Sequence, residues 1–462
     1  MGYKSLDKLF YSDKENYEKI YNERYKSEYA VHLDFLIHDN PAFFVMIPEF
    51  ITKIRDIYKT DKQIKALRDS LPEKAIDHFA IRCLVDEIVK TNDIEGVYSS
   101  RREINSVLSE LETKSHGKRF MGLVQKYLML QKNETMSFDT CEDIRNLYND
   151  LVYFEIEEDN PSDLPDGKIF RKDSTSVLSA TQKELHRGVN PEGKIIECMN
   201  KALAILNDKS IECVFRISIF HYLFGYIHPF YDGNGRTSRF ISSYLLSKEF
   251  ESIIGYRMSY SIKENINDYY KAFKVCNDPK NKGDLTPFII MFTDIIDDSL
   301  HKLVYALEKR LEQLTHYGKC IIFLPKGADE KYSDLYFLLI QASLFSESGI
   351  STKELMDVMK LSRSTVTNRL NTLSDYGLII KKTLGNIRCY SLDIDKIDTI
   401  MEEKNNKKNR PDLLAQVGAE TTTQGAVILL KAIILYHTPL NFSSFEYQGI
   451  FAPFFKQKEC IK

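Results

Sequence analysis

The chain has 462 residues, enough for about two or three domains, and 43% of them are hydrophobic, which is ample for buried cores. A net charge of −3 excludes a chain-wide electrostatic attraction to nucleic acid or to a membrane surface. There is neither an apolar leader segment nor a run of 18 apolar residues, so we expect a cytoplasmic protein with no membrane contact.

Changes in residue pattern along the chain predict five stretches. We expect a helical region, a helical core that carries the reactive side chains, a linker helix, a compact helix-turn-helix unit and a tail in which we read no function. Their predicted bounds are, in chain order, 1–115, 116–300, 301–332, 333–395 and 396–462.

The first stretch ends in a short polar motif. Leu84 and Ile88 predict a helix that stops at Gly96, because glycine is the usual residue just past a helix end. Thr91 and Glu95 are four residues apart and therefore share one face of that helix.

The second stretch holds a chemically dense bend between two apolar helices. Residues 213–227 are almost wholly apolar or aromatic, which predicts a buried helix, and residues 240–246 continue in the same way. Between them, Gly233 and Gly235 allow backbone N–H groups to approach a phosphate closely. A helix starting near Asn234 would point its positive dipole end at the same place.

Four side chains of this bend suit nucleotide chemistry. Arg236 and Arg239 are three apart and can grip phosphates from one helix face. Asp232 offers the hard oxygen that Mg²⁺ prefers. His228 is neutral near pH 7 and can accept a proton.

The run from His228 to Arg239 resembles the signature of the Fic family, H-P-F-x-D-G-N-G-R-x-x-R, with every fixed position filled. The resemblance implies a mainly α fold, a Fic-type helical core with a small β-hairpin flap, and transfer of AMP from ATP to a hydroxyl side chain of a protein. The implied roles are general base for His228, Mg²⁺ ligand for Asp232, anion hole for the backbone of Gly233 and Gly235 with the Asn234 amide, and phosphate binding for Arg236 and Arg239.

The upstream motif is similar to the inhibitory motif of many Fic proteins, [S/T]-x-x-x-E-[G/N]. By this resemblance Glu95 pairs with Arg239 and occupies the guanidinium that the γ-phosphate of ATP needs. The carboxylate could also position water for removal of AMP. Gly235 favours AMP transfer over the kinase activity of relatives that carry a bulkier residue at this position.

Three further site assignments rest on the resemblance and have ordinary alternatives. Tyr269, Tyr270 and Asn277 are similar to the stretch that borders adenine, although a tyrosine pair on an apolar helix is often core. Residues 167–171 and 177–189 are β-prone and predict a hairpin. Residues 183–189 are our candidate flap, with target-docking residues Leu185, His186, Gly188 and Val189, and the alternative is a plain connecting hairpin. His221 is interpreted as a core histidine.

The unit at 333–395 resembles a winged helix-turn-helix. Its second helix leaves polar side chains facing outward, namely Ser364, Thr365, Thr367, Asn368 and Arg369. Both DNA binding and protein contact stay open for this unit.

We therefore expect a self-inhibited protein adenylyltransferase that uses ATP and Mg²⁺ and modifies a Ser, Thr or Tyr hydroxyl of a protein, including itself. A homodimer is left open. The alternative hypothesis is a nucleotide-sensing regulator that binds DNA through the winged helix.

Overall fold

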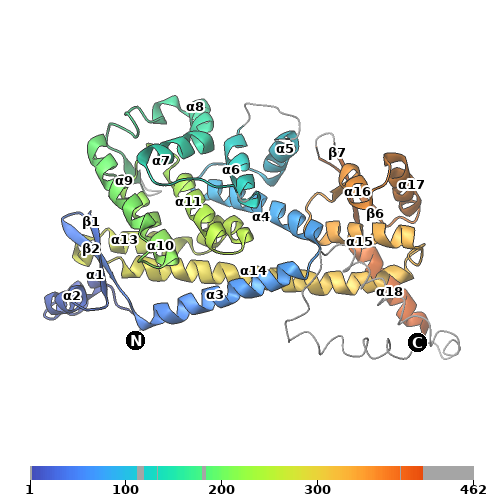
Figure 1. The fold of residues 1–462 in the computed structure, drawn as a ribbon, viewed down its shortest axis with the longest axis horizontal. Coiled ribbons are helices and arrows are strands. Elements are labelled where there is room, and N and C mark those ends of the chain that lie inside the picture. The colour runs from blue at the N-terminus through green and yellow to red at the C-terminus, as the bar shows by residue number, and fades with distance from the viewer. Residues whose placement is uncertain (1–2, 112–118, 133, 179–183, 385–386, 409–462) are drawn as a thin grey trace. The chain divides into compact units, whose positions relative to one another are not determined.

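The computed structural model describes residues 3–111, 119–132, 134–178, 184–384 and 387–408, and this part of the chain is mainly helical, as predicted (Figure 1). The chain divides into two units, Met1–Glu402 and Glu403–Lys462. All elements below lie in the first unit except the end of the last helix. The predicted tail at 396–462 lies outside the described residues from residue 409 onward.

The N-terminal stretch is not wholly helical, contrary to the prediction. An antiparallel hairpin interrupts it, because Leu33, Phe35 and Ile37 alternate with exposed residues and bury one face of a strand. The hairpin is followed by two 22-residue helices, α3 and α4. The bounds are α1 Leu6–Ser12, α2 Tyr17–Tyr25, β1 Ala30–Ile37, β2 Asn40–Val45, α3 Pro48–Asp69, α4 Glu73–Ile94 and α5 Arg101–Leu111.

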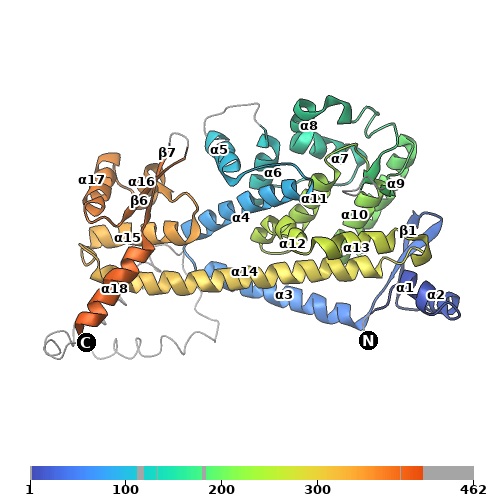
Figure 2. The same ribbon diagram turned by 180° about the vertical axis from the view of Figure 1, so that it is seen from behind.

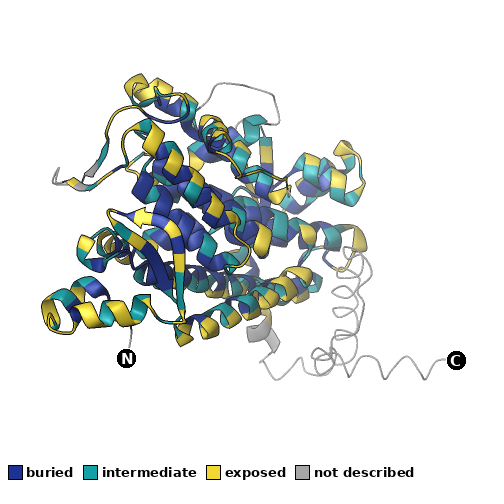
Figure 3. Ribbon diagram, turned by 60° about the vertical axis from the view of Figure 1, so that its left-hand side comes forward, coloured by how far each residue is buried: buried dark blue, intermediate teal, exposed yellow. Residues whose placement is uncertain are grey.

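The centre of the molecule is helix α10, as its all-round apolar sequence predicts. Twelve of its residues are buried, and α9, α11 and α14 pack around it. Figure 3 shows the buried residues of the described part in dark blue, gathered in its interior. The bounds of the central elements are α6 Met121–Gln131, α7 Cys141–Tyr148, α8 Phe154–Asp159, β3 Ser176–Leu178, β4 Glu184–Arg187, α9 Glu192–Asn207, α10 Cys213–Ile227, α11 Asn234–Glu249, α12 Met258–Glu264 and α13 Ile266–Cys276.

Helix α14, Thr286–Cys320, is continuous over 35 residues. The predicted boundary at residue 300 therefore falls inside a helix, and α14 runs beside α3 along much of its length (Figure 1 and Figure 2). No helix in the described ranges is both long and apolar enough to cross a membrane.

The C-terminal elements follow the predicted order of helix, turn, helix and hairpin. Ser351 and Glu354 form a reciprocal capping box at the start of α16, and β5, β7 and β6 form a small sheet. Interpretation of this unit as a winged helix with a DNA or protein partner stays a prediction. The bounds are α15 Glu330–Phe345, β5 Ile350–Ser351, α16 Thr352–Met359, α17 Arg363–Ser374, β6 Ile379–Leu384, β7 Ile387–Leu392 and α18 Ile394–Lys408.

Candidate functional site

The bend between α10 and α11 is built from two residues in the left-handed backbone region. His228 ends α10 with φ 51°, and its N–H donates to the Phe224 carbonyl at 2.9 Å. Gly233, with φ 79°, precedes α11, and a Cβ there would lie 2.9 Å from Val152. Glycine therefore serves here both for its backbone conformation and for close packing.

The side chain of Asn234 stabilises the bend by two hydrogen bonds with the backbone of Phe230. Its side-chain Oδ1 accepts from the Phe230 N–H at 2.9 Å, and its Nδ2 donates to the Phe230 carbonyl at 2.7 Å. The structure thus places this amide against the loop backbone, whereas the family resemblance implies a place in the anion hole. Phe230 is fully buried, and its ring stacks on the Tyr148 ring with 3.8 Å between the ring centroids, so it anchors the bend in the core.

The His228 imidazole lies in an environment that opposes a positive charge. Burial lowers its pKa to about 4, with smaller contributions from the neighbouring His186 and Arg171, and Glu95 acts in the opposite direction. A neutral imidazole at pH 7 is the form that can accept a proton.

Arg239 is held by two residues from the end of α4, Thr91 and Glu95. Its side chain is 1% exposed and pairs with the Glu95 carboxylate at 2.7 Å. Its Nε donates to the Thr91 hydroxyl at 2.9 Å, and an NH2 group donates to the Thr91 carbonyl at 3.0 Å. The structure therefore brings together Thr91, Glu95 and Arg239, which the chain separates by 148 residues between the first and the last.

Glu95 also reaches the first turn of α11. A Cβ added to Gly235 would lie 2.0 Å from Glu95 Oε1 and 2.8 Å from an Arg239 NH group. Burial by itself would raise the pKa of Glu95, but the ion pair with Arg239 outweighs it and leaves that pKa below its ordinary value. A carboxylate thus occupies the positive end of α11, the position where an anion binds most readily.

Arg236 has a partner that sequence reasoning missed. It is 1% exposed and forms a buried ion pair with Glu155, which precedes it by 81 residues. It also contacts Asp232 at 3.2 Å. No spacing signal in the sequence links Glu155 to the bend.

Asp232 suits a metal ion that arrives with its own ligands. Its carboxylate accepts from the Gly233 N–H at 2.6 Å, and its side chain is 43% exposed. No group of three or more His, Cys, Asp or Glu side chains in the described residues could hold a metal ion alone. A single exposed carboxylate fits Mg²⁺ that is bound chiefly by phosphate oxygens and water.

A hairpin lies in the second of the two predicted β-prone runs and is bonded to the end of α10, whereas the first run, 167–171, forms no strand. Strands β3 and β4 pair antiparallel, and after them the Val189 N–H donates to the Ile227 carbonyl at 3.0 Å. Gly188 donates to the Thr175 carbonyl. Leu185 lies on β4, and its side chain and the connecting residues 179–183 are outside the described part.

His186 lies on β4 and contacts the end of α10, and its expected role in target docking stays a prediction. Its Nε2 contacts the Tyr226 carbonyl at 2.6 Å, and its ring lies on the Tyr226 ring. The imidazole is thus turned onto the end of α10.

The aromatic candidates lie on α13. Tyr269 is buried and its hydroxyl contacts His221 Nε2 at 2.8 Å, which confirms His221 as a core histidine with satisfied hydrogen bonds. Tyr270 is 49% exposed, and its pKa is raised by burial and by Glu95. Asn277 follows the last residue of α13 and lies about 10 Å from Tyr270 along the helix axis. Its side-chain oxygen accepts a hydrogen bond from the Tyr222 hydroxyl.

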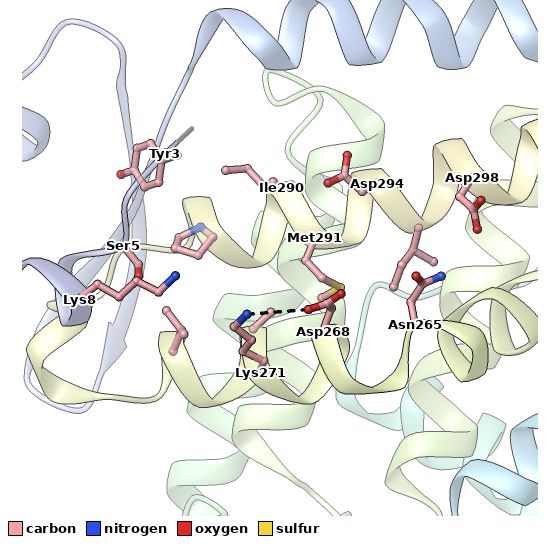
Figure 4. Close-up of a pocket in the computed structure, with 14 residues that line it drawn as sticks. Tyr3, Ser5, Lys8, Asn265, Asp268, Lys271, Ile290, Met291, Asp294 and Asp298 are labelled. Atoms are coloured by element: carbon pink, nitrogen blue, oxygen red, sulfur yellow. Dashed lines mark ion pairs between the residues drawn. The ribbon is translucent and has the colours of Figure 1, made fainter. Parts of the chain in front are cut away.

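A separate groove lies between the N-terminus and the faces of α13 and α14 (Figure 4). It carries charges of both signs, including Lys8, Lys271 and Asp294, and contains none of the residues predicted for the site. We therefore assign the groove no part in the chemistry of the bend.

Part of the chain is similar in sequence to known proteins. Residues 139–246 match the model of the Fic/DOC family. A protein adenylyltransferase Fic of Drosophila yakuba is 34% identical over 94 residues, which cover 20% of this chain and 17% of that relative. The Drosophila melanogaster protein of the same name is 33% identical over 94 residues, with the same coverage. The chain therefore spans less than a fifth of the length of these curated relatives.

Among solved structures, a Fic family protein from Desulfovibrio desulfuricans G20 has a TM-score of 0.47 and 18% identity, and the match covers 76% of this chain and 97% of that one. Fic-1 from C. elegans has a TM-score of 0.38 and 18% identity, with 56% of this chain and 74% of that chain covered.

Proposed function

We propose that this chain, a Fic family protein through residues 139–246, transfers AMP from ATP to a hydroxyl side chain of a protein. The observation that carries the proposal is the bend itself. A neutral imidazole at His228 and the start of α11 meet there, next to a buried guanidinium at Arg239.

In the proposed reaction the target hydroxyl attacks the α-phosphorus of ATP. The bond from that phosphorus to the bridging oxygen of pyrophosphate breaks, and pyrophosphate leaves with the electron pair. The hydroxyl proton passes to the His228 imidazole, whose lowered pKa keeps it free to accept a proton at pH 7. The products are an AMP ester of the target and pyrophosphate.

The residues of the bend have separate parts in binding ATP. Backbone N–H groups in the first turn of α11 have no partner within the helix and would face the phosphates. Arg239 would bind the γ-phosphate by a charge-assisted fork once Glu95 leaves it. Asp232 would hold Mg²⁺, which when bound neutralises phosphate charge during bond breaking.

We further propose that Glu95 inhibits the enzyme in this form. Its carboxylate both pairs with Arg239 and lies against Gly235, so a triphosphate and Glu95 compete for one space. Removal of AMP through a Glu95-positioned water remains part of the proposal, at the same site.

The experiment uses ATP that is labelled either at the α- or at the γ-phosphate. We expect Glu95→Gly protein to incorporate the α label into itself or a protein mixture, and to incorporate no γ label. Incorporation should be lost in Glu95→Gly/His228→Ala. Incorporation of the γ label would instead indicate phosphoryl transfer and would refute the proposal.

The alternative, a DNA-binding regulator, gains no support from these comparisons. Part of its outward-facing residue set is also used internally, since Arg369 donates to the Lys331 carbonyl at 2.9 Å. Absence of any label in Glu95→Gly protein, together with sequence-specific DNA binding, would restore it.

A further inference from the structure

Arg171 is a buried arginine whose partners are all backbone carbonyls. It is fully buried in the loop that precedes β3. Its Nε donates to the His228 carbonyl at 2.9 Å and an NH2 group to the Val189 carbonyl at 2.7 Å. The other NH group donates to the Asp173 carbonyl. One guanidinium thus joins its own loop, the base of the β3–β4 hairpin and the bend.

The positive charge of Arg171 has no ion-pair partner among the described residues. Buried cations are generally paired with a carboxylate, because an uncompensated charge in the interior costs several kcal/mol. Carbonyl dipoles satisfy the N–H groups here but do not cancel the charge. Burial accordingly lowers the pKa of Arg171.

The Arg171 guanidinium is packed tightly against both the base of the hairpin and His228. A Cβ added to Gly188 would lie 2.4 Å from an Arg171 NH2 group and 3.0 Å from the His228 Cβ. Two imidazoles, those of His186 and His228, lie close enough for the charge of Arg171 to disfavour their protonation.

We propose that Arg171 is a positioning residue for His228. It fixes the carbonyl, and so the left-handed backbone turn, from which the imidazole projects, and its charge disfavours a second positive charge on that imidazole. This inference rests on the proposed function, in which His228 is the general base.

The charged groups around His228 agree with this role. Arg171 from the loop before β3 and His186 from β4 oppose its protonation, and Glu95 from the end of α4 favours it. With Arg171 neutralised, only burial and His186 would hold the imidazole in its basic form.

The first test reads His228 directly and needs no activity. Imidazole resonances of isotope-labelled histidine are followed by NMR against pH in the full chain, with the His228 signal assigned by its loss in His228→Ala. We expect the protonated fraction of His228 at about pH 5 to rise about threefold or more in Arg171→Gln. In Arg171→Lys, which keeps the charge, that fraction should stay close to the wild-type value.

Arg145→Gln is the matched control. Arg145 holds the same loop by donating a hydrogen bond to the Ile169 carbonyl at 2.8 Å. Its described contacts do not include His228. The control should leave the His228 titration unchanged. Equal titration curves in wild type and Arg171→Gln would overturn the electrostatic part of the proposal. If Arg171→Gln does not fold, a His228 titration in Arg171→Lys that moves to the ordinary histidine range would overturn it as well.

The second test measures AMP transfer in the Glu95→Gly background. The ratio of the initial rate at about pH 5 to that at about pH 8 should fall by about a fifth or more with Arg171→Gln and stay unchanged with Arg171→Lys and Arg145→Gln. A lower rate with an unchanged ratio would leave Arg171 as a purely structural contact and would contradict the inference. Failure of the proposed function itself is recognised separately, as absence of transfer in Glu95→Gly alone.

Discussion

At the scale of single residues, the partner of Arg239 determines whether the proposed ATP site is blocked or open. Its guanidinium is buried with two neighbours, Thr91 and Glu95, which both come from the end of α4. An arginine presents a rigid fork of donors that fits one carboxylate or one phosphate edge at a time. Inhibition therefore follows from occupancy of the fork, with no change of fold required.

Arg239→Ala should impair use of ATP in the Glu95→Gly background. We expect kcat/KM to fall by about a hundredfold, which corresponds to about 3 kcal/mol of charge-assisted hydrogen bonding to phosphate. Arg239→Lys should recover only part of the loss, because an ammonium group keeps the charge but not the fork. Steady-state kinetics with varied ATP provides the measurement, and an unchanged kcat/KM in Arg239→Ala would remove the residue from the site.

Sequence reasoning was informative for residues that share a motif and uninformative for their distant partners. His228, Asp232 and Arg239 lie within twelve residues, so their local geometry follows from two helices and a bend. Glu155 and Arg171 are far away in the chain and have no spacing relation to the bend. Glu155 reaches the site because α8 lies against α11, and Arg171 reaches it because the loop after α8 bonds to the His228 carbonyl.

At the scale of elements, the join between α10 and α11 is closely packed. Helix α11 begins directly after Gly233, and Gly235 has no room for a side chain on the side that faces Glu95. Since the first turn of a helix is also where an anion binds, the same restriction applies to the phosphates of ATP.

Gly235→Ala should therefore reduce AMP transfer even when Glu95 is absent. In the Glu95→Gly background we expect the rate to fall by about tenfold or more, because the new methyl group occupies the phosphate position. Gly193→Ala is the control, since a Cβ there would meet no atom within 4 Å. Equal rates for the two double variants would show that nucleotide does not approach the start of α11.

The hairpin β1–β2 shows where element prediction failed. The surrounding sequence is rich in charge and tyrosine, and its helical character hid a short alternation of buried and exposed residues at Leu33, Phe35 and Ile37. Alternation over so few residues is a weak signal beside long amphipathic helices. The β3–β4 hairpin was predicted, because no helical periodicity competed with it.

At the scale of the whole molecule, the core contains ionisable groups that make its stability depend on pH. His221 lies at its centre on α10, between Ser242 and Tyr269. Burial lowers its pKa from 6.5 to about 3, with a smaller contribution from Arg239. The unfolded chain therefore binds a proton at His221 below about pH 6.5, and the folded chain does so only near pH 3.

Stability should consequently fall as the pH is lowered through this window. We expect His221 to account for a loss of about 2 kcal/mol in the free energy of unfolding between about pH 7 and pH 5. His221→Gln, which can still hydrogen-bond, should have a flatter dependence on pH although it is less stable at pH 7. Denaturant unfolding at the two pH values is the measurement, and parallel losses in both proteins would contradict the assignment.

The most direct test of the central claim is intact-mass spectrometry of the purified full chain after incubation with ATP and Mg²⁺. We expect Glu95→Gly protein to gain the mass of one or more AMP groups. The wild-type chain should gain far less, and Glu95→Gly/His228→Ala none. Equal modification of wild type and Glu95→Gly would contradict inhibition by Glu95, and undiminished modification in the double variant would contradict His228 as the base.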